Sequence, residues 1–488
     1  MSDFIRKNWS RMLQLFYAFA LFLLNFVRIF DDNFWGDEAY TIRLAQMQLQ
    51  PMFTETAGDV HPPLYYMLVR LFCSIFGYRG EVFHFVSLIP YGIVMVLALT
   101  IVRSRYGRIA SLVFMTIASL MPQAVQYNVE VRMYSWGAFF VLLSYLFLWR
   151  IFTYNRRIDY VGFTFSSLAA AYTHYYCLVS AAFFYVTLIF VALVRRKDFL
   201  KKTLLCCMAT VVGYLPWFFI LLRTLERTAD DFWMAWIPTL RECIAFFFSG
   251  SCQYILFAML MLGTAAFFLQ QIRDLKEKPG DAAGLLSLRL SGMILSADTV
   301  WCLAGLLSMF GTSFVGIMIS RLIRPLFIVR YLYPVSIVAW LLLGFSLSRL
   351  KGRVFYGSVV LAILYLSCIP QYYNTYLNDR TENEKLRSTL TATTGEIGIG
   401  DEILTDLAQI DWTVSDYYYA GVSHSLITFD SFPELEHDIE YWLILDVGRA
   451  SENVSWLNAQ GYCCEEKVSD GILGTSPVSI YRLCTEAE

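Results

Sequence analysis

The stretch MLQLFYAFALFLLNFVRIF, residues 12–30, is a nearly unbroken run of apolar side chains. A helix rises about 1.5 Å per residue, so a run of this length crosses the roughly 30 Å hydrocarbon core of a bilayer. The motif Trp35-Gly36-Asp37-Glu38-Ala39-Tyr40 follows within five residues. The sequence therefore predicts a membrane helix with two carboxylates, Asp37 and Glu38, directly beyond its end.

The composition of the whole chain is that of a membrane protein. Of its 488 residues, 57% are hydrophobic, which exceeds the apolar fraction of soluble domains. The net charge is −2, and no basic patch of the kind that binds nucleic acid is evident. Nucleic acid is therefore not expected as a partner, whereas membrane lipids are.

Apolar runs of about 20 residues recur along the first 372 residues and predict a polytopic α-helical membrane protein with about eleven spans. The run 159–194 is too long for one helix, and the polar break at residues 172–176 divides it into two. The expected spans are 12–30, 82–102, 109–126, 135–154, 159–174, 177–194, 203–222, 242–270, 291–320, 331–348 and 354–372.

The distribution of basic residues predicts how these spans cross the membrane. Short loops rich in Lys and Arg stay in the cytoplasm, and such clusters occur in alternate predicted loops, for example at residues 103–108, 156–157, 195–202 and 349–353. We therefore expect a multi-pass protein of the cell membrane. Its amino terminus is expected in the cytoplasm and its carboxyl-terminal domain outside.

Two regions lie outside the predicted spans. The first is an outer loop, 31–81, in which residues 63–77 form an amphipathic helix that follows Pro62-Pro63 and lies at the interface. The second is the segment 373–488, where apolar density falls and turn residues multiply. Residues 1–372 are thus expected to form the membrane domain.

The carboxyl-terminal segment reads as a small extracytoplasmic α/β domain. Residues 402–405 and 441–446 have the composition of short strands. Cys463, Cys464 and Cys484 lie in the same segment. An exported domain permits one disulfide, from either Cys463 or Cys464 to Cys484.

Five polar motifs fall on the predicted outer face of the membrane domain. Charged side chains are costly near lipid, so their gathering on one surface predicts an active site there. The motifs are Asp37-Glu38, Asp59-Val60-His61-Pro62-Pro63-Leu64-Tyr65-Tyr66, Glu130-Val131-Arg132-Met133-Tyr134, His174-Tyr175-Tyr176 and Arg330-Tyr331-Leu332-Tyr333-Pro334.

The acidic residues of these motifs suit proton transfer. A carboxylate at the rim of a half-dry cavity is able to accept a proton from a hydroxyl, which makes Asp37 the candidate base, with Glu38 orienting it. Glu130 is the third catalytic candidate, for acceptor or metal. The alternative for Asp37 and Glu38 is that they cap a helix running to about Gln50.

The basic and aromatic residues suit the binding of a phosphate and its lipid. Guanidinium groups bind phosphate oxygens, so Arg330, Arg132 and Arg324 are candidate phosphate ligands. Arg132 has the alternative of pairing with Glu130.

The remaining candidates bind substrate or metal. His61 and His174, with Tyr65 and Tyr331 of the same motifs, are candidate substrate contacts, although each histidine equally suits a structural role. A divalent metal ion is a candidate cofactor, with Asp37, Glu130 and His61 as its candidate ligands.

In chain order, WGDEAYT, DVHPPLYY, EVRMYSW, THYY and RYLYP resemble the motifs of the integral-membrane glycosyltransferases of the GT-C fold. The resemblance is to family 39, the dolichyl-phosphate-mannose-protein mannosyltransferase-like group, to which the lipid A aminoarabinose transferases are related. It covers roughly residues 1–370.

This resemblance implies an enzyme of a bacterial plasma membrane. The implied reaction is an inverting transfer of one sugar from a polyprenyl-phosphate donor to an acceptor hydroxyl at the extracytoplasmic face. Asp37 matches the catalytic acid-base position, Glu38 its partner, and Arg330 a position near the donor phosphate. Glu130 and Arg132 match the motif of the second outer loop.

Two other functions remain open from the sequence. One is a transporter or flippase of lipid-linked saccharides, and the other is a glycan ligase or polymerase of the same fold. Transporters usually carry charges at the membrane midplane and internal repeats. Here the charges gather at one predicted surface and no repeat is evident, which favours catalysis.

Overall fold

The computed structural model describes residues 2–194, 197–228, 236–276, 296–323, 325–436 and 438–485. The chain forms two compact units, which we call the helical unit and the mixed unit. The helical unit comprises Met1–Ile29, Leu49–Leu68 and His84–Tyr372, and the mixed unit comprises Phe30–Gln48, Val69–Phe83 and Tyr373–Glu488.

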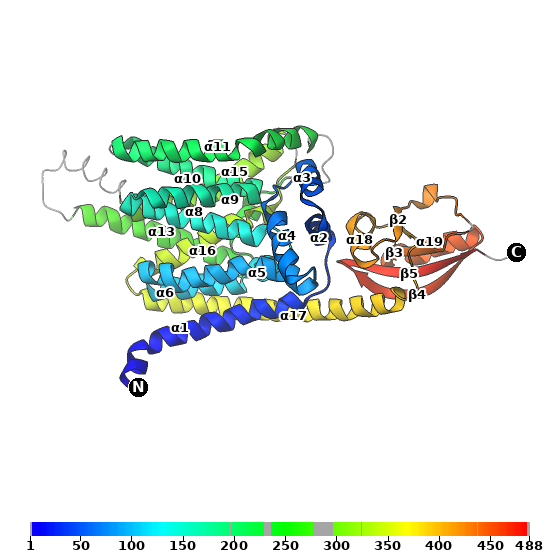
Figure 1. The fold of residues 1–488 in the computed structure, drawn as a ribbon. Coiled ribbons are helices and arrows are strands. Elements are labelled where there is room, and N and C mark those ends of the chain that lie inside the picture. The colour runs from blue at the N-terminus through cyan, green and yellow to red at the C-terminus, as the bar shows by residue number, and fades with distance from the viewer. Residues whose placement is uncertain are drawn as a thin grey trace. The chain divides into compact units, whose positions relative to one another are not determined.

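Nine helices in the described ranges are long and apolar enough to span a membrane, which confirms the predicted fold class. The long helices of the helical unit run side by side (Figure 1). The helices from the amino terminus to residue 393 are α1 (Ser2–Phe26), η1 (Val27–Phe30), α2 (Gly36–Gln46), α3 (Leu49–Gly58), α4 (Leu64–Phe76), α5 (Gly80–Leu97), η2 (Ala98–Val102), α6 (Arg103–Leu120), α7 (Pro122–Tyr127), α8 (Tyr134–Tyr154), α9 (Arg157–Thr173), α10 (Tyr175–Val194), α11 (Lys197–Thr228), α12 (Leu240–Phe247), α13 (Gln253–Lys276), α15 (Ala297–Leu322), η3 (Val329–Leu332), α16 (Tyr333–Arg349) and α17 (Arg353–Thr393).

Two features reconcile these nine helices with the eleven predicted spans. The continuous stretch Gly80–Leu120 contains the predicted span 82–102 and most of 109–126, and Gly107, at φ +90°, interrupts its helical backbone. The expected end at 126 is wrong, because Met121 has extended backbone and α7 is a separate helix. Helix α9 has 17 residues and is shorter than the nine. The predicted break in 159–194 is confirmed, because His174 has extended backbone between α9 and α10.

Two predicted spans differ from the structure. The single helix expected over 242–270 is wrong, since α12 and α13 are separate helices and Gly250 between them has a φ of +98°. The helix expected over 354–372 continues to Thr393 as α17. The part of α17 beyond residue 372 is polar, so apolar length did not reveal it. Within it, Arg380 and Glu384 form an ion pair at the i,i+4 spacing that supports a helix.

Helix α16 forms the centre of the helical unit. Residues 331–348 are all buried, and α16 packs against α6, α8, α13 and α15. Small residues permit these close approaches. A side chain at Gly344 would place a carbon 2.8 Å from the Ala110 carbonyl oxygen of α6.

A buried polar network fixes the end of α16 that lies near the motif residues. Asn128 donates hydrogen bonds to Asn25 Oδ1 of α1 (3.2 Å) and to the Ala118 carbonyl (3.0 Å), and the Tyr333 hydroxyl donates to Asn128 Oδ1 (3.0 Å). Asn128 precedes Glu130 by two residues, and Tyr333 follows Arg330 by three. The network therefore ties together the two segments that carry these charged residues.

The mixed unit contains a five-stranded sheet with the order β2-β1-β3-β5-β4. Strand β1 pairs in parallel with β2 and β3, whereas β5 is antiparallel to β3 and β4. The elements are β1 (Glu402–Thr405), η4 (Ile410–Val414), α18 (Ser415–Tyr418), β2 (Ser423–Leu426), η5 (Phe429–Ser431), β3 (Tyr441–Asp446), α19 (Val447–Ala459), β4 (Tyr462–Leu473) and β5 (Ser476–Thr485).

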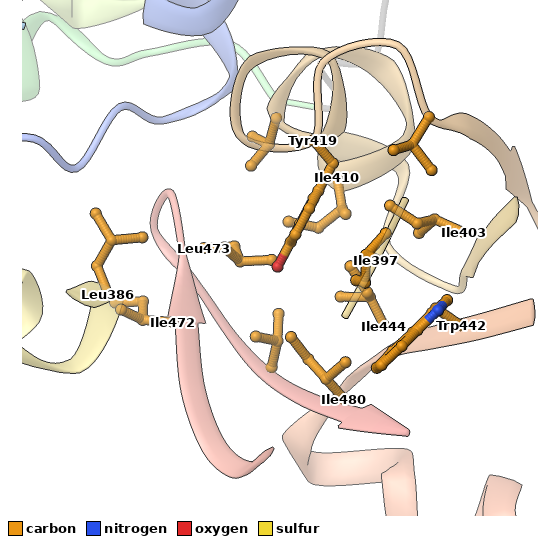
Figure 2. Packing of buried hydrophobic residues seen from close by; sticks show 13 residues of the cluster. Leu386, Ile397, Ile403, Ile410, Tyr419, Trp442, Ile444, Ile472, Leu473 and Ile480 are labelled. Carbon is orange, nitrogen blue, oxygen red and sulfur yellow. The ribbon is translucent and has the colours of Figure 1, made fainter. Parts of the chain in front are cut away.

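The core of the mixed unit joins the sheet to the polar end of α17. Ile403 and Trp442, from adjacent strands, are fully buried, and Leu386 of α17 belongs to the same cluster. Figure 2 shows these side chains together with Ile472 and Ile480 of the antiparallel hairpin. The carboxyl-terminal segment therefore has a hydrophobic core of its own.

Helix α2, which carries Asp37, belongs to the mixed unit and is anchored there by Phe34, two residues before its start. The Phe34 ring packs edge to face against the rings of Phe83 and Tyr417, with centroids 6.1 Å and 5.1 Å away. The Phe34 N–H also donates to the Tyr418 hydroxyl (2.9 Å). These contacts fix the start of α2 against carboxyl-terminal residues.

The register of the β4–β5 hairpin distinguishes the two predicted disulfides. Cys463 lies opposite Cys484, while Cys464 lies opposite Leu483. All three cysteines are free thiols in the structure. Opposed residues bring their Cβ atoms within the range that a disulfide needs, so we expect oxidation to join Cys463 to Cys484. Alkylation without reductant followed by peptide mass mapping tests this, and a Cys464–Cys484 peptide would contradict it.

Candidate functional site

The loop between α3 and α4 carries an acid–imidazole pair. The Asp59 carboxylate lies 3.4 Å from His61 Nδ1 and accepts a hydrogen bond from the Tyr66 hydroxyl (3.3 Å). Burial raises the pKa of Asp59, but the hydrogen bond and charge of His61, the Val60 N–H and the charge of Arg132 outweigh it and lower the pKa below its ordinary value. Asp59 is therefore ionised at neutral pH and orients His61.

Tyr65 and Tyr66 have different surroundings although both follow the two prolines. Tyr65, the predicted substrate contact, is fully buried and shares a hydrogen bond with Ser87 Oγ of α5 (2.7 Å). Tyr66 is the tyrosine that contacts Asp59. The Tyr65 hydroxyl therefore links α4 to α5.

The turn between α7 and α8 presents Glu130 and Arg132, whose exposures are 6% and 2%. Gln126 holds both the backbone and the side chain of Glu130. The Gln126 carbonyl accepts a hydrogen bond from the Glu130 N–H (3.1 Å), and the Gln126 side-chain amide donates one to Glu130 Oε2 (3.0 Å). His84 Nδ1 lies 2.8 Å from the Val129 carbonyl. The turn is therefore held at Val129 and at Glu130 itself.

His174, at the junction of α9 and α10, is a neutral hydrogen-bond donor. Burial and the nearby charges of His61, Arg132 and Arg330 lower its pKa well below the ordinary value. The Tyr176 N–H donates to His174 Nδ1 (3.1 Å), so the proton of the neutral ring lies on Nε2. Among the described residues this buried Nε2 has no hydrogen-bond partner.

Aromatic rings surround His174. The Tyr331 ring, from η3, lies 4.8 Å from the imidazole and 5.4 Å from the Tyr176 ring, measured between centroids. The His61 ring lies 5.5 Å from His174. Three loops far apart in sequence therefore meet at one imidazole.

The charges of Arg330 and Glu130 both act on Tyr127. Burial raises the pKa of Tyr127, the charge of Glu130 raises it further, and the charge of Arg330 opposes both. Arg330 and Arg132 both act electrostatically on His174. We call Asp59, His61, Glu130, Arg132, His174 and Arg330 the polar cluster.

A cavity of about 170 Å³ opens beside the polar cluster in the helical unit. His61, His174 and Tyr331 form its polar part, and Leu178, Leu221 and other apolar side chains line the rest. A site of this kind suits a ligand with a polar head and a hydrocarbon tail.

Most of the predicted site residues of the membrane domain are thus brought together. The rings of His61 and Tyr331 lie against His174. The charges of Arg132 and Arg330 act on His174, and Glu130 lies in the same turn as Arg132. Arg324 lies outside the described residues, and Arg321, at the end of α15, is exposed.

Asp37 and Glu38 lie in the first turn of α2, in the mixed unit. Glu38 is buried, and its carboxylate accepts a hydrogen bond from the Trp35 N–H (3.4 Å). This is the capping contact that the sequence offered as the alternative for this pair. Asp37 is half-buried, and α2 ends at Gln46 rather than near Gln50.

Within the helical unit, His61 and Glu130 belong to no metal-binding group formed by the described residues. In neither unit do three His, Cys, Asp or Glu side chains of the described residues gather as a metal ion requires. His61 is oriented by Asp59, and Glu130 by Gln126. We therefore derive no chemical step through a metal.

Sequence reasoning missed three residues that shape the site. Asp59 stands two positions before His61 in the quoted motif, and this spacing was a usable signal. His84 and Tyr127 lie in apolar stretches, where no pattern marks them. His84 contacts the Val129 carbonyl of the turn that carries Glu130, and the Tyr127 ring packs against Tyr134 and Tyr333.

Acid should weaken the Asp59–His61 pair in a characteristic way. The pKa of Asp59 is lower in the folded chain than in the unfolded chain, so its contribution to stability is present above the unfolded value and lost as pH falls through the folded one. We expect Asp59→Asn to cost about 1–3 kcal/mol at neutral pH and less in acid. Thermal unfolding in detergent at several pH values measures this, and the exposed Asp430→Asn is the control. An unchanged difference across the pH range would contradict the assignment.

Comparisons with known proteins match one segment of the chain to a family and the whole chain to solved structures. Residues 60–220 match the family described as dolichyl-phosphate-mannose-protein mannosyltransferase. The matched segment includes His61, Glu130, Arg132 and His174. No curated protein matches the chain.

Two crystal structures of ArnT from Cupriavidus metallidurans are similar to the whole chain. The structure in the apo state has a TM-score of 0.57, and the structure bound to undecaprenyl phosphate has one of 0.55. Each is 13% identical and is matched over 96% of this chain and 97% of that chain. The likeness establishes the fold, and together with the family match it confirms the resemblance that the motifs indicated.

Proposed function

We propose that this protein is a membrane glycosyltransferase that transfers a single sugar from a polyprenyl-phosphate donor to an acceptor hydroxyl, with inversion. The observation that carries the proposal is an apolar cavity in the helical unit whose polar part is formed by His61, His174 and Tyr331, with the charges of Arg132 and Arg330 acting on His174. The family match and the ArnT structure with bound undecaprenyl phosphate support the same donor class.

The polar cluster suits the phosphate of such a donor. Guanidinium groups bind phosphate oxygens in two-pronged geometry, and the half-dry setting strengthens the attraction. The neutral His174 supplies a further N–H from Nε2 to an oxygen of the phosphate or sugar. The apolar part of the cavity then holds the start of the polyprenyl chain, with Tyr331 against it.

The transfer itself is a single displacement. The acceptor oxygen attacks the anomeric carbon from the side opposite the phosphate, the bond from that carbon to the phosphate oxygen breaks, and polyprenyl phosphate leaves. Arg132 and Arg330 stabilise the charge that develops on the leaving phosphate. In this proposal the Asp37 carboxylate takes the proton of the acceptor hydroxyl, and Glu38 orients Asp37. Glu130 positions the acceptor hydroxyl.

The reaction is assigned to the extracytoplasmic face of a bacterial plasma membrane. The basis is the alternation of basic loops, which leaves the motif residues at the opposite helix ends. The acceptor class is a protein, a lipid or a cell-surface glycan.

The deciding experiment incubates the purified chain with a panel of polyprenyl-phosphate sugars, with and without candidate hydroxyl acceptors. We expect consumption of one donor and release of polyprenyl phosphate, and the anomeric configuration of the product, read by NMR, should be inverted. A donor that stays intact throughout, yet crosses the bilayer of a proteoliposome, would instead support a carrier.

A further inference from the structure

A second cavity, of about 450 Å³, lies between the first halves of α9 and α11. Its mouth residue Arg157 begins α9, whereas His174 of the polar cluster follows the other end of that helix. At about 1.5 Å per residue the two are about 25 Å apart along the helix. The second cavity is therefore separate from the candidate active site.

The packing of α9 against α11 gives this cavity a closed end and a floor. A side chain at Gly213 would come within 2.8 Å of Leu168, and the Tyr172 hydroxyl donates to the Gly213 carbonyl (2.9 Å). Thr164 Oγ1 and Cys206 Sγ meet at 3.0 Å and form the floor. The helices thus touch beyond Leu168 and leave space towards Arg157.

The open end of the cavity is positively charged. Among the lining residues that the structure describes, Arg157 and Lys202 are cationic and none is anionic. Lys202 is held in place because its ammonium donates to the Asn155 carbonyl (3.1 Å) at the turn before α9. The nearby Asp159 is fully buried and pairs with Arg150 (2.5 Å). The charge at the mouth is therefore complementary to an anion.

The flanks of the cavity are apolar and open outwards. Phe165 of α9 is 68% exposed and Leu205 of α11 is 51% exposed, and both line the cavity. They belong to helices of the membrane domain, so this exposed surface faces hydrocarbon. A cationic mouth at a helix end above an apolar flank is the pattern by which pockets between membrane helices hold anionic lipids.

We propose that this cavity binds a diacyl phospholipid with an anionic headgroup, its phosphate on Arg157 and Lys202 and an acyl chain along Phe165 and Leu205. The basic loops assign this site to the cytoplasmic leaflet. It acts independently of the sugar donor, whose phosphate is assigned to Arg132 and Arg330.

Native mass spectrometry of the full chain in neutral detergent tests the site. The probes are phosphatidylglycerol, zwitterionic phosphatidylcholine and undecaprenyl phosphate. We expect phosphatidylglycerol to bind about tenfold or more tightly than phosphatidylcholine. Lys202→Gln should lose most of that preference, whereas Lys201→Gln removes the same charge from an exposed neighbouring side chain that does not line the cavity and should retain it.

A second variant tests the apolar part without changing charge. Ala209 lines the cavity, so Ala209→Trp should fill it and weaken phosphatidylglycerol binding about tenfold with the thermal unfolding temperature unchanged. Equal binding of the two phospholipids, or equal losses in Lys201→Gln and Lys202→Gln, would overturn the proposal. So would a site that prefers undecaprenyl phosphate, since that would make it a second donor-lipid site.

Discussion

Arg330→Gln is expected to lower the rate of sugar transfer by about 100- to 1000-fold. In our proposal the guanidinium stabilises charge that grows on the departing phosphate, so its loss falls mainly on the chemical step. Its charge acts on both His174 and Tyr127. Steady-state donor consumption in detergent or nanodiscs measures the effect, with kcat separated from KM.

Two companion variants make this result specific. Arg330→Lys keeps the charge but loses the planar fork, so it should fall between wild type and Arg330→Gln. Arg321→Gln removes an exposed guanidinium from the end of α15 and should leave transfer unchanged. If Arg321→Gln were as damaging as Arg330→Gln, general charge at the membrane surface would explain the loss.

Asp37→Asn is the second variant for which we expect a large effect, a fall in kcat of about 100- to 10,000-fold. The amide keeps the size of the side chain but accepts no proton, so the acceptor hydroxyl loses its base. Donor binding, measured by native mass spectrometry with polyprenyl-phosphate sugar, should be nearly unchanged. Asp37→Glu should restore part of the rate.

The neighbouring Asp32 provides the control for Asp37. It is half exposed, and its carboxylate lies 3.6 Å from Arg387, a surface pair that contributes little to stability. Asp32→Asn should therefore transfer sugar at the wild-type rate. Full activity in Asp37→Asn would remove the proposed base and leave Glu130 as the remaining catalytic acid to test.

The membrane spans could be predicted because apolar length is a physical requirement of the bilayer. Even the division at His174 was visible, since polar residues interrupt an apolar run there. The separation of α12 from α13 was missed because both helices are apolar, and only the positive φ of Gly250 marks the break. Apolar composition alone does not reveal such a backbone conformation.

The sheet of the mixed unit was only partly predictable. Strands β1 and β3 have the predicted bounds, 402–405 and 441–446, because their side chains are buried and apolar. Strand β4 contains Glu465, Glu466 and Lys467 in succession and is largely exposed. Its pairing with β5 comes from long-range register, for which its own composition gives little signal.

The sequence predicted which residues belong to the candidate site better than it predicted the contacts between them. The alternation of the predicted membrane spans placed His61, Arg132, His174 and Arg330 on one face of the membrane. In the structure His61, Arg132 and Arg330 all act on His174. Their orientation depends on groups such as Asp59 and Gln126. These supporting residues are ordinary in sequence and become recognisable only when the fold brings them into contact.

The hydrogen bond between Asn25 and Asn128 has a consequence for biogenesis. Asn25 lies within an apolar helix, and its partner is synthesised 103 residues later. At about 5–20 residues per second, the ribosome needs roughly 5–20 s to deliver that partner. During this interval the Asn25 amide oxygen depends on water or on an insertase, because lipid offers it no hydrogen-bond donor.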